Sequence, residues 1–274
     1  MNYTVLGAGG FIGGALKSAL LARGIEPFCP GRSDIIDTRN LGTVFYCIGL
    51  TADFRQRPFD TIEAHVTLLN HLLRTADFKR LIYLSSTRVY AGLEGLVDES
   101  ATLHVNPNNS SDLYNLSKLM GESACLQSGR EAVVARISNV VGPDFSSPNF
   151  IFDLIRDALS KGIICLRSSP VSSKDYIRLE DAVEALIAIA LLPSPKPIYN
   201  IASGRNITNS QICETIAAAT KCAVSYPDDS PLLDFPLICT AKARNDLRLL
   251  PKPLLNTIED LANQSRTTKK GDKL

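Results

Sequence analysis

The stretch VLGAGGFIGGAL, residues 5–16, carries glycines at positions 7, 10 and 13, between an apolar run and an amphipathic segment. In a glycine-rich turn from strand to helix, backbone N–H groups can approach a pyrophosphate, and the positive end of the helix dipole faces its charge. The pattern alone is weak, because glycines also cluster in ordinary turns. Its position after the first apolar run and before a helical segment favours dinucleotide binding. The predicted cofactor-binding residues of this turn are Gly7, Gly10, Phe11, Ile12 and Gly13.

Short apolar runs alternate with helical stretches through the first half of the chain. The apolar runs are YTVLG, EPFCP, TVFYCIG, RLIYLSS and AVVARIS, and helices are expected over 11–23, 60–76 and 113–128. This alternation indicates βαβ units and predicts an α/β fold with a Rossmann-type, doubly wound parallel sheet. Only about a dozen residues, GRSDIIDTRNLG, separate the second run from the third, which leaves no room for a full crossover helix. We therefore expect that edge of the sheet to be trimmed.

The composition changes after Pro143, where pieces of strand and helix are separated by Pro-rich spacers. We expect residues 1–142 to form an NAD(P)-binding Rossmann domain whose sheet is completed by parts of 163–200. Residues 143–274 should form mainly a smaller, C-terminal substrate-binding lobe over the carboxyl ends of the strands, where open α/β folds bind ligands. Residues 263–274 are polar and basic and are expected to be a flexible tail.

Composition excludes several classes of function. The chain has 274 residues, 45% hydrophobic and 21% charged, with a formal net charge of +1, so nothing favours nucleic acid or an anionic membrane as partner. Seven cysteines are scattered without a C-x-x-C pair or zinc-ligand spacing, which predicts reduced thiols, no metal and a cytoplasmic protein. The run AVEALIAIALL, 182–192, contains Glu184 and is too short to span a bilayer, so a buried helix is expected. The start, MNYTVLGAGG, shows no secretory signal.

The second apolar run should end at the adenosine ribose of a bound cofactor. NAD sites usually place Asp or Glu there, whereas this chain has Gly31 and Arg32. A guanidinium suits a 2′-phosphate through charge-assisted hydrogen bonds, so Arg32 favours NADP. NAD stays open as the alternative because Asp34 could reach the ribose, and Arg32 could also be a solvated loop charge.

YNLSK, residues 114–118, places Tyr114 and Lys118 four residues apart, on one face of the expected helix. A free phenol titrates near pH 10, and a nearby ammonium favours the phenolate. We therefore expect Lys118 to lower the pKa of Tyr114 and to make it a usable acid or base. An ordinary surface pair is the alternative. The context favours catalysis, because Ser86, Thr87 and Asn139 stand at or just beyond the ends of two expected strands, where a ligand would lie.

Six motifs follow one another from residue 3 to about residue 220: G-x-x-G-x-x-G, LSSTRVYAG, YNLSK, RISNVVGP, KDYIRLEDAVEAL and YNIASG. Together they resemble the extended short-chain dehydrogenase/reductases, and more narrowly the NAD-dependent epimerase/dehydratase family, which acts largely on nucleotide sugars. The set is far more specific than any one motif.

The resemblance implies roles for individual residues. Tyr114 would be the catalytic acid–base, Lys118 the cation that tunes it and holds the nicotinamide ribose, and Ser86 the catalytic hydroxyl, with Thr87 beside it. Asn139 would contact the substrate's phosphates. The resemblance also implies a homodimer through the helix that carries Tyr114, and it places three further residues at the cofactor: Ile48, Gly49 and Ile137.

Departures from the family pattern narrow the chemistry. Sugar 4,6-dehydratases of this family carry an Asp-Glu pair where this chain has Thr87 and Arg88, which makes dehydration an unfavoured reaction. The family's arginine before DY is Lys174 here, which can neutralise a substrate phosphate but lacks the bidentate fork. His65 replaces a usual asparagine and, with no evident acidic partner, is interpreted as structural.

The leading hypothesis is an NAD(P)-dependent oxidoreductase acting on a nucleotide-linked 4-keto or 4-hydroxy sugar. Within this hypothesis, Arg32 slightly favours a 4-ketoreductase that consumes NADPH. A 4-epimerase with tightly bound NAD uses the same residues and is the first alternative. A reductase for a non-sugar carbonyl and a non-catalytic NADP(H)-binding sensor or scaffold also stay open, although such sensors typically lose the tyrosine or the lysine.

Overall fold

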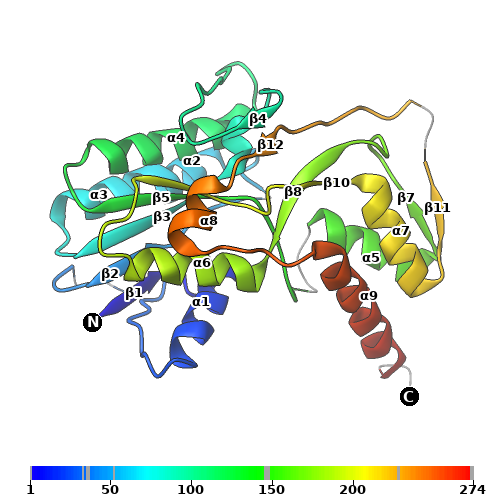
Figure 1. Ribbon diagram of the computed structural model, residues 1–274, viewed down its shortest axis with the longest axis horizontal. Helices are drawn as coiled ribbons and strands as arrows, with labels where there is room; N and C mark the ends of the chain where they lie inside the picture. Colours follow the sequence, from blue (N-terminus) through cyan, green and yellow to red (C-terminus); the bar gives the residue numbers. More distant parts are fainter. Residues whose placement is uncertain are drawn as a thin grey trace.

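The centre of the protein is a five-stranded parallel sheet, seen in a computed structural model that describes residues 2–32, 34, 38–51, 53–144, 149–226 and 229–271. Its strands lie in the order β1-β2-β3-β5-β9, and every neighbouring pair is parallel. Their bounds are β1 Tyr3–Leu6, β2 Thr43–Tyr46, β3 Arg80–Ser86, β5 Ala132–Ile137 and β9 Ile198–Ile201. The predicted α/β fold with a parallel, Rossmann-type sheet is confirmed (Figure 1).

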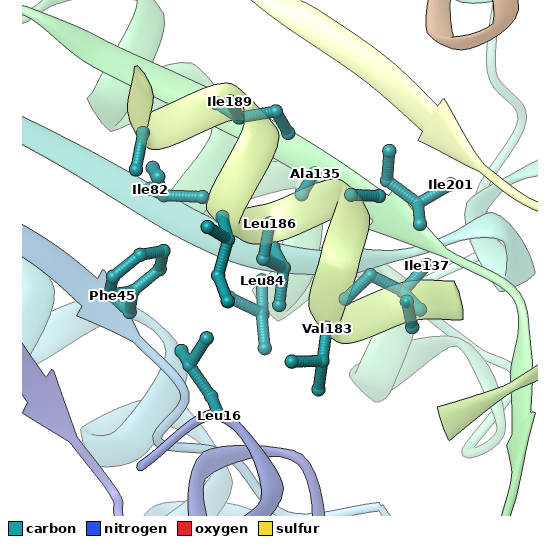
Figure 2. Close-up of a cluster of buried hydrophobic side chains, with 14 of the residues drawn as sticks. Leu16, Phe45, Ile82, Leu84, Ala135, Ile137, Val183, Leu186, Ile189 and Ile201 are labelled. Atoms are coloured by element: carbon teal, nitrogen blue, oxygen red, sulfur yellow. The ribbon is translucent and has the colours of Figure 1, made fainter. Parts of the chain in front are cut away.

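Helices cover both faces of this sheet, which is why its strands are almost entirely buried. On one face α1 (Phe11–Leu21) and α6 (Leu179–Leu191) pack against alternate residues of the strands. Figure 2 shows this cluster, whose labelled members include Leu16, Phe45, Ile82, Leu84, Val183 and Leu186. On the other face lie α3 (Leu68–Thr75) and α4 (Asp112–Gln127), packed against the intervening residues, such as Val44, Tyr46, Leu81 and Tyr83. The apolar run predicted as a buried helix is α6.

The edge of the sheet beside β1 is trimmed, and more than the sequence suggested. The run EPFCP, expected to be a strand, forms only a bridge between Phe28 and Thr4, with two backbone hydrogen bonds around Phe28. Pro27 and Pro30 flank this bridge, and proline has no N–H to donate to a ladder. Residues 33 and 35–37 of the short connection that follows lie outside the described residues.

The connection between β2 and β3 was expected to be one helix over 60–76. It consists of α2 (Pro58–Ile62), a π-helical turn (Glu63–Thr67) and α3. The wider turn is held to the sheet by two phenols, because Tyr46 donates to the Ala64 carbonyl and Tyr83 to the His65 carbonyl, at 2.6 and 3.2 Å. This places His65 in the interior behind β2 and β3.

The second half of the chain adds a smaller lobe with its own apolar core, at the right of Figure 1. Its strands form two sheets: β6 (Asn139–Val141), β8 (Ser173–Arg178) and β10 (Asn206–Thr208) in one, β7 (Ile163–Cys165) and β11 (Ala223–Ser225) in the other. Its helices are α5 (Phe150–Lys161), α7 (Asn209–Thr220) and α9 (Leu254–Gly271). Four further short elements come from two separate parts of the chain, and β4 and β12 pair with each other. They are η2 (Thr87–Tyr90), β4 (Leu96–Val97), β12 (Leu237–Ile238) and α8 (Ala241–Leu247).

The last helix, α9, runs to Gly271, and its earlier part is anchored in the lobe, where Ala262 is buried and Arg266 donates to the Ala219 carbonyl at 2.9 Å. The flexible tail expected over 263–274 stays a prediction. Residues 272–274 lie outside the described residues. Within the part of the chain that the structure describes, no helix has the length and apolarity needed to cross a membrane.

Candidate active site

The glycine turn has the geometry of a phosphate cradle. Gly7 has a φ of +84°, which side-chain-bearing residues rarely adopt, and the Gly10 N–H donates to its carbonyl at 3.0 Å. A Cβ on Gly13 would lie 2.2 Å from the same carbonyl oxygen, so nothing larger than glycine fits there. Helix α1 starts at Phe11, so the backbone N–H groups of its first turn, which have no partner within the helix, face the glycine turn.

Three further predicted cofactor residues, Ile48, Gly49 and Ile137, lie along the carboxyl edge of the sheet. Gly7 packs on the end of β2, where its Cβ would come within 3.1 Å of the Ile48 nitrogen. Gly49 follows, and a Cβ there would lie 3.4 Å from the Lys118 Nζ. Ile137 is buried at the end of β5 and is the register partner of Ser86 on β3. The structure therefore brings these residues to the carboxyl edge of one sheet, from the turn to Lys118.

Tyr114 lies in the first turn of α4 and is 6% exposed. The Ser86 hydroxyl lies near the Tyr114 phenol, and the Ser86 Oγ accepts from the Arg88 backbone N–H at 3.2 Å. Burial raises the pKa of Tyr114 above its ordinary value, and the Ser86 hydroxyl and the Arg88 charge offset only part of that rise. The expectation that Lys118 lowers this pKa is wrong for the free protein.

Lys118 is not among the groups that shift this pKa, and its ammonium is engaged by the backbone. Its ammonium donates to the Leu84 carbonyl at 2.8 Å and lies 5.9 Å from the centre of the Tyr114 ring. Burial lowers the pKa of Lys118 to about 7, an effect that the nearby Glu122 carboxylate partly offsets. One of its three donors is engaged by Leu84, and the group lies beside Gly49 at the cofactor edge.

His65 is structural, as the sequence indicated, and its partner is a serine. The Leu50 N–H donates to Nε2 at 3.2 Å, which makes Nδ1 the protonated nitrogen facing the Ser117 hydroxyl at 2.8 Å. The ring meets the Tyr114 ring edge-on, with 5.4 Å between centroids. Burial and the Lys118 charge lower the pKa of His65 to about 3, so it is neutral and fixes α4 against the loop after β2.

A cavity of about 200 Å³ connects the predicted catalytic and substrate residues. Ser86, Thr87 and Tyr114 line one part of it, and Asn139 and Lys174 line it from β6 and β8. The Asn139 amide donates to the Asp175 carbonyl at 2.8 Å. Burial and the charge of Arg88 lower the pKa of Lys174, whose Nζ lies 5.3 Å from the centre of the Phe235 ring.

Several residues of this cavity were missed by the sequence analysis. Phe235 and Pro236 enter it from the Pro-rich spacer before β12, where no motif points to a site. Thr51 lines it from the loop after β2. Arg88 also lines it. The sequence analysis considered Arg88 only because it stands where the family's dehydratases carry an acidic residue. The mutual position of such residues depends on long-range packing that no local pattern records.

Arg32 is exposed in the turn after the Phe28 bridge. Asp34 is the residue that kept NAD as the alternative cofactor. One of its carboxylate oxygens accepts from the Gly31 N–H at 2.6 Å. Its carboxylate thus already has a backbone partner in this turn. Among the residues that the structure describes, no group of three or more His, Cys, Asp or Glu side chains could hold a metal ion.

Comparisons with known proteins agree with this picture. The model of the family described as "NAD dependent epimerase/dehydratase family" matches residues 3–202. A putative GDP-L-fucose synthase 2 of Oryza sativa subsp. japonica is 23% identical over 171 residues, covering 57% of this chain and 49% of that protein. The dTDP-D-glucose 4,6-dehydratase of Mus musculus is 26% identical over 179 residues, covering 63% and 48%. The matched region thus spans about half the length of these relatives.

Solved structures share the whole architecture at low identity. MoeE5 in complex with UDP-glucuronic acid and NAD has a TM-score of 0.83 at 21% identity, covering 98% of this chain and 100% of that one. TunA, an NAD-dependent NDP-hexosamine 5,6-dehydratase, has a TM-score of 0.81 at 19% identity, covering 96% of both chains. RMD from Pseudomonas aeruginosa complexed with NADPH has a TM-score of 0.79 at 19% identity, covering 98% and 100%. These likenesses establish the fold.

Proposed function

Because this chain belongs to the NAD-dependent epimerase/dehydratase family, we propose that it is a nicotinamide-dependent oxidoreductase acting on a nucleotide-linked sugar, with 4-ketoreduction as the favoured reaction. One observation carries the proposal. The hydroxyls of Ser86 and Tyr114 line a cavity that Asn139 and Lys174 also enter. Two groups able to transfer a proton and two side chains able to bind phosphate therefore share one space.

The residues present fit a nicotinamide dinucleotide. The cradle at Gly7 and Gly13 leaves no space for a Cβ, and backbone N–H groups at the start of α1 suit a pyrophosphate. Lys118 lies at the other end of the same edge, where its free donors can hold a ribose. When bound, the cofactor supplies hydride acceptance or donation. Arg32 supports NADP as the preferred form, with NAD as the alternative.

Tyr114 would exchange a proton with the sugar oxygen at C4. Its raised pKa keeps the phenol protonated at neutral pH, which suits a reaction in which a carbonyl oxygen gains a proton. Ser86, whose oxygen accepts from the Arg88 N–H, would orient that oxygen with its own hydroxyl proton. The protonated phenol supports the reductive direction.

Asn139 and Lys174 would bind the nucleoside diphosphate. Lys174 is partly buried and its pKa is lowered by burial first, then by Arg88, so an anion in the cavity would stabilise its charged form. Dehydration is not proposed, because Thr87 and Arg88 offer no carboxylate pair beside Tyr114. The dimer expected through α4 belongs to this proposal, and it is supported by exposed apolar side chains on that helix and on α2, Met120 and Phe59.

The test is a turnover assay with purified protein, NADPH or NADH, and UDP-, dTDP- or GDP-linked 4-keto-hexoses. We expect stoichiometric oxidation of the reduced nicotinamide, and its loss in Tyr114→Phe. Interconversion of C4 epimers without net oxidation would replace the reductase with the epimerase. Absence of both reactions, with normal cofactor binding, would favour the non-catalytic sensor.

A further inference from the structure

Two cationic side chains, Arg88 and Lys174, line the cavity, and a third, Arg55, lies next to Arg88. The Asp175 carboxylate of the same lining accepts from Ser203 and the Arg205 N–H. Arg55 and Arg88 both donate to Ser111, the residue before α4: Arg55 to its hydroxyl at 2.8 Å and Arg88 to its carbonyl at 3.3 Å. Lys174 lines the same cavity as Arg88. In the described part of the chain, none of the three forms a salt bridge with a carboxylate, and the Nε of Arg88 is buried with no hydrogen-bond partner.

These cations repel one another. After burial, the charge of Arg55 is the next cause that lowers the pKa of Arg88, and the charge of Arg88 likewise lowers the pKa of Lys174. Asp112 attracts Arg88 only weakly, and its oxygens accept from the Asn106 N–H and the Asn115 amide. Like charges that are partly buried without a counterion destabilise a fold, and an anionic ligand relieves that cost.

Arg88 packs on the ring of Tyr114, the proposed acid–base. Its guanidinium lies 5.6 Å from the centre of the Tyr114 ring and 5.3 Å from that of Phe54. Two residues before it stands Ser86, which lines the cavity with Tyr114. Lys174, in contrast, packs on Phe235 and adjoins Asp175, whose carbonyl holds Asn139. One cation thus borders the catalytic hydroxyls, and the other borders the proposed phosphate-binding residues.

We propose that Arg88 binds a carboxylate on the sugar itself, so that the preferred substrate is a nucleoside-diphosphate hexuronate rather than a neutral hexose. This inference rests on the proposed function. A hexuronate carries its carboxylate on C5, next to the C4 oxygen that Ser86 and Tyr114 would hold. The planar guanidinium can take a carboxylate through paired hydrogen bonds, one from the orphaned Nε. A neutral CH₂OH group would leave that charge without a counterion.

The experiment compares matched substrates that differ only at C6. Binding of UDP-glucuronate and UDP-glucose, and of GDP-mannuronate and GDP-mannose, is measured by calorimetry in the presence of NADP⁺ or NAD⁺, with UDP and GDP as references. The wild-type protein should bind the uronate of a pair about 10- to 100-fold more tightly, the range for a charged hydrogen-bonded pair. Arg88→Gln should lose this preference while its affinity for the neutral sugar stays within about twofold.

Arg88→Lys and Arg55→Gln are the matched variants. Arg88→Lys keeps the positive charge but lacks the planar guanidinium, so it should recover part of the preference for the uronate. Partial recovery would also separate the effect on binding from the loss of the hydrogen bond to the Ser111 carbonyl. Arg55→Gln removes an exposed charge near the same serine and should keep the preference. Thermal unfolding of each variant shows whether it is folded.

The outcomes separate the two proposals. Equal affinity of the wild-type protein for the two sugars of a pair overturns this inference alone. So does an Arg88→Gln protein that loses affinity for both sugars and for the free nucleotide alike, since Arg88 would then bind the diphosphate. Failure of every nucleotide sugar to bind would overturn the proposed function as well.

Discussion

Ser86, at the carboxyl end of β3, and Tyr114, in the first turn of α4, line the same cavity, and the Ser86 hydroxyl lies close enough to the phenol to lower its pKa. Ser86 belongs to a strand in the middle of the sheet, and Tyr114 to a helix that covers one face of it. The pair is buried enough that the phenol has a raised pKa and keeps its proton. A proton donor positioned in this way is the basis of the proposed chemistry.

Removing that proton should stop the reaction and leave binding intact. Tyr114→Phe is expected to lower kcat by about 10²- to 10⁴-fold, the usual contribution of a positioned acid–base group. The ring itself packs between Phe54 and His65 and is preserved by the substitution. Cofactor fluorescence titration should therefore give an unchanged Kd. A variant with wild-type kcat would remove Tyr114 from the mechanism.

The lowered pKa of Lys118 makes the stability of the free protein depend on pH. An unfolded lysine titrates near 10.4, and the folded value is about 7, so between these values the unfolded chain binds more protons. The penalty for burying the charge is thus fully present below pH 7 and is relieved as the pH rises towards 10. Relative to Lys118→Met, the wild-type protein should gain on the order of 4 kcal/mol over this range.

Urea unfolding of the cofactor-free proteins at pH 6, 8 and 9.5 measures this difference. The comparison with Lys118→Met cancels the titration of other groups. A constant difference in unfolding free energy at all three pH values would show that Lys118 is not desolvated.

The glycine cradle should not tolerate a methyl group at Gly13. The Cβ of Gly13→Ala would lie 2.2 Å from the Gly7 carbonyl oxygen, so α1 must shift away from the turn. We expect a loss of about 1–3 kcal/mol in unfolding free energy and no measurable cofactor binding. Gly9→Ala is the control, because its Cβ meets nothing within 4 Å and its stability should match the wild type.

A buried ion pair behind the site should be indispensable for stability. Glu122 accepts from the Arg136 guanidinium at 2.6 Å and from the Ser85 hydroxyl at 2.5 Å, with all three side chains buried. Glu122→Gln leaves Arg136 charged and without its carboxylate, which typically costs about 3–5 kcal/mol. Denaturant unfolding tests this. Glu131→Gln, at a half-exposed carboxylate paired with Arg80, is the control and should cost less than about 1 kcal/mol.

The choice of cofactor should depend on Arg32. If it holds the 2′-phosphate, Arg32→Ala weakens NADP⁺ binding about tenfold and leaves NAD⁺ binding unchanged. Competitive binding of the two cofactors gives the ratio. Equal loss for both, or for neither, would make Arg32 a solvated loop charge.

Local patterns were sufficient for the parts of this protein whose causes are local. The glycine spacing, the alternation of apolar runs with helices and the four-residue separation of Tyr114 and Lys118 each depend on residues close in sequence. The parallel sheet and the position of Tyr114 at its carboxyl edge agree with those predictions. The run EPFCP shows where such reasoning stops, because its apolar residues suggested a strand while two prolines allowed only a bridge.

The amino-acid sequence by itself determined the α/β class, the dinucleotide cradle and the candidate Ser86, Tyr114 and Lys118, because spacing along strands and helices decides which side chains share a face. Only the tertiary structure decided the sign of the Tyr114 pKa shift and the meeting of Arg88 with Lys174 and Phe235 in one cavity. Burial and the field of distant charges set these properties. Both are sums over neighbours that the folded chain brings together from far apart in sequence.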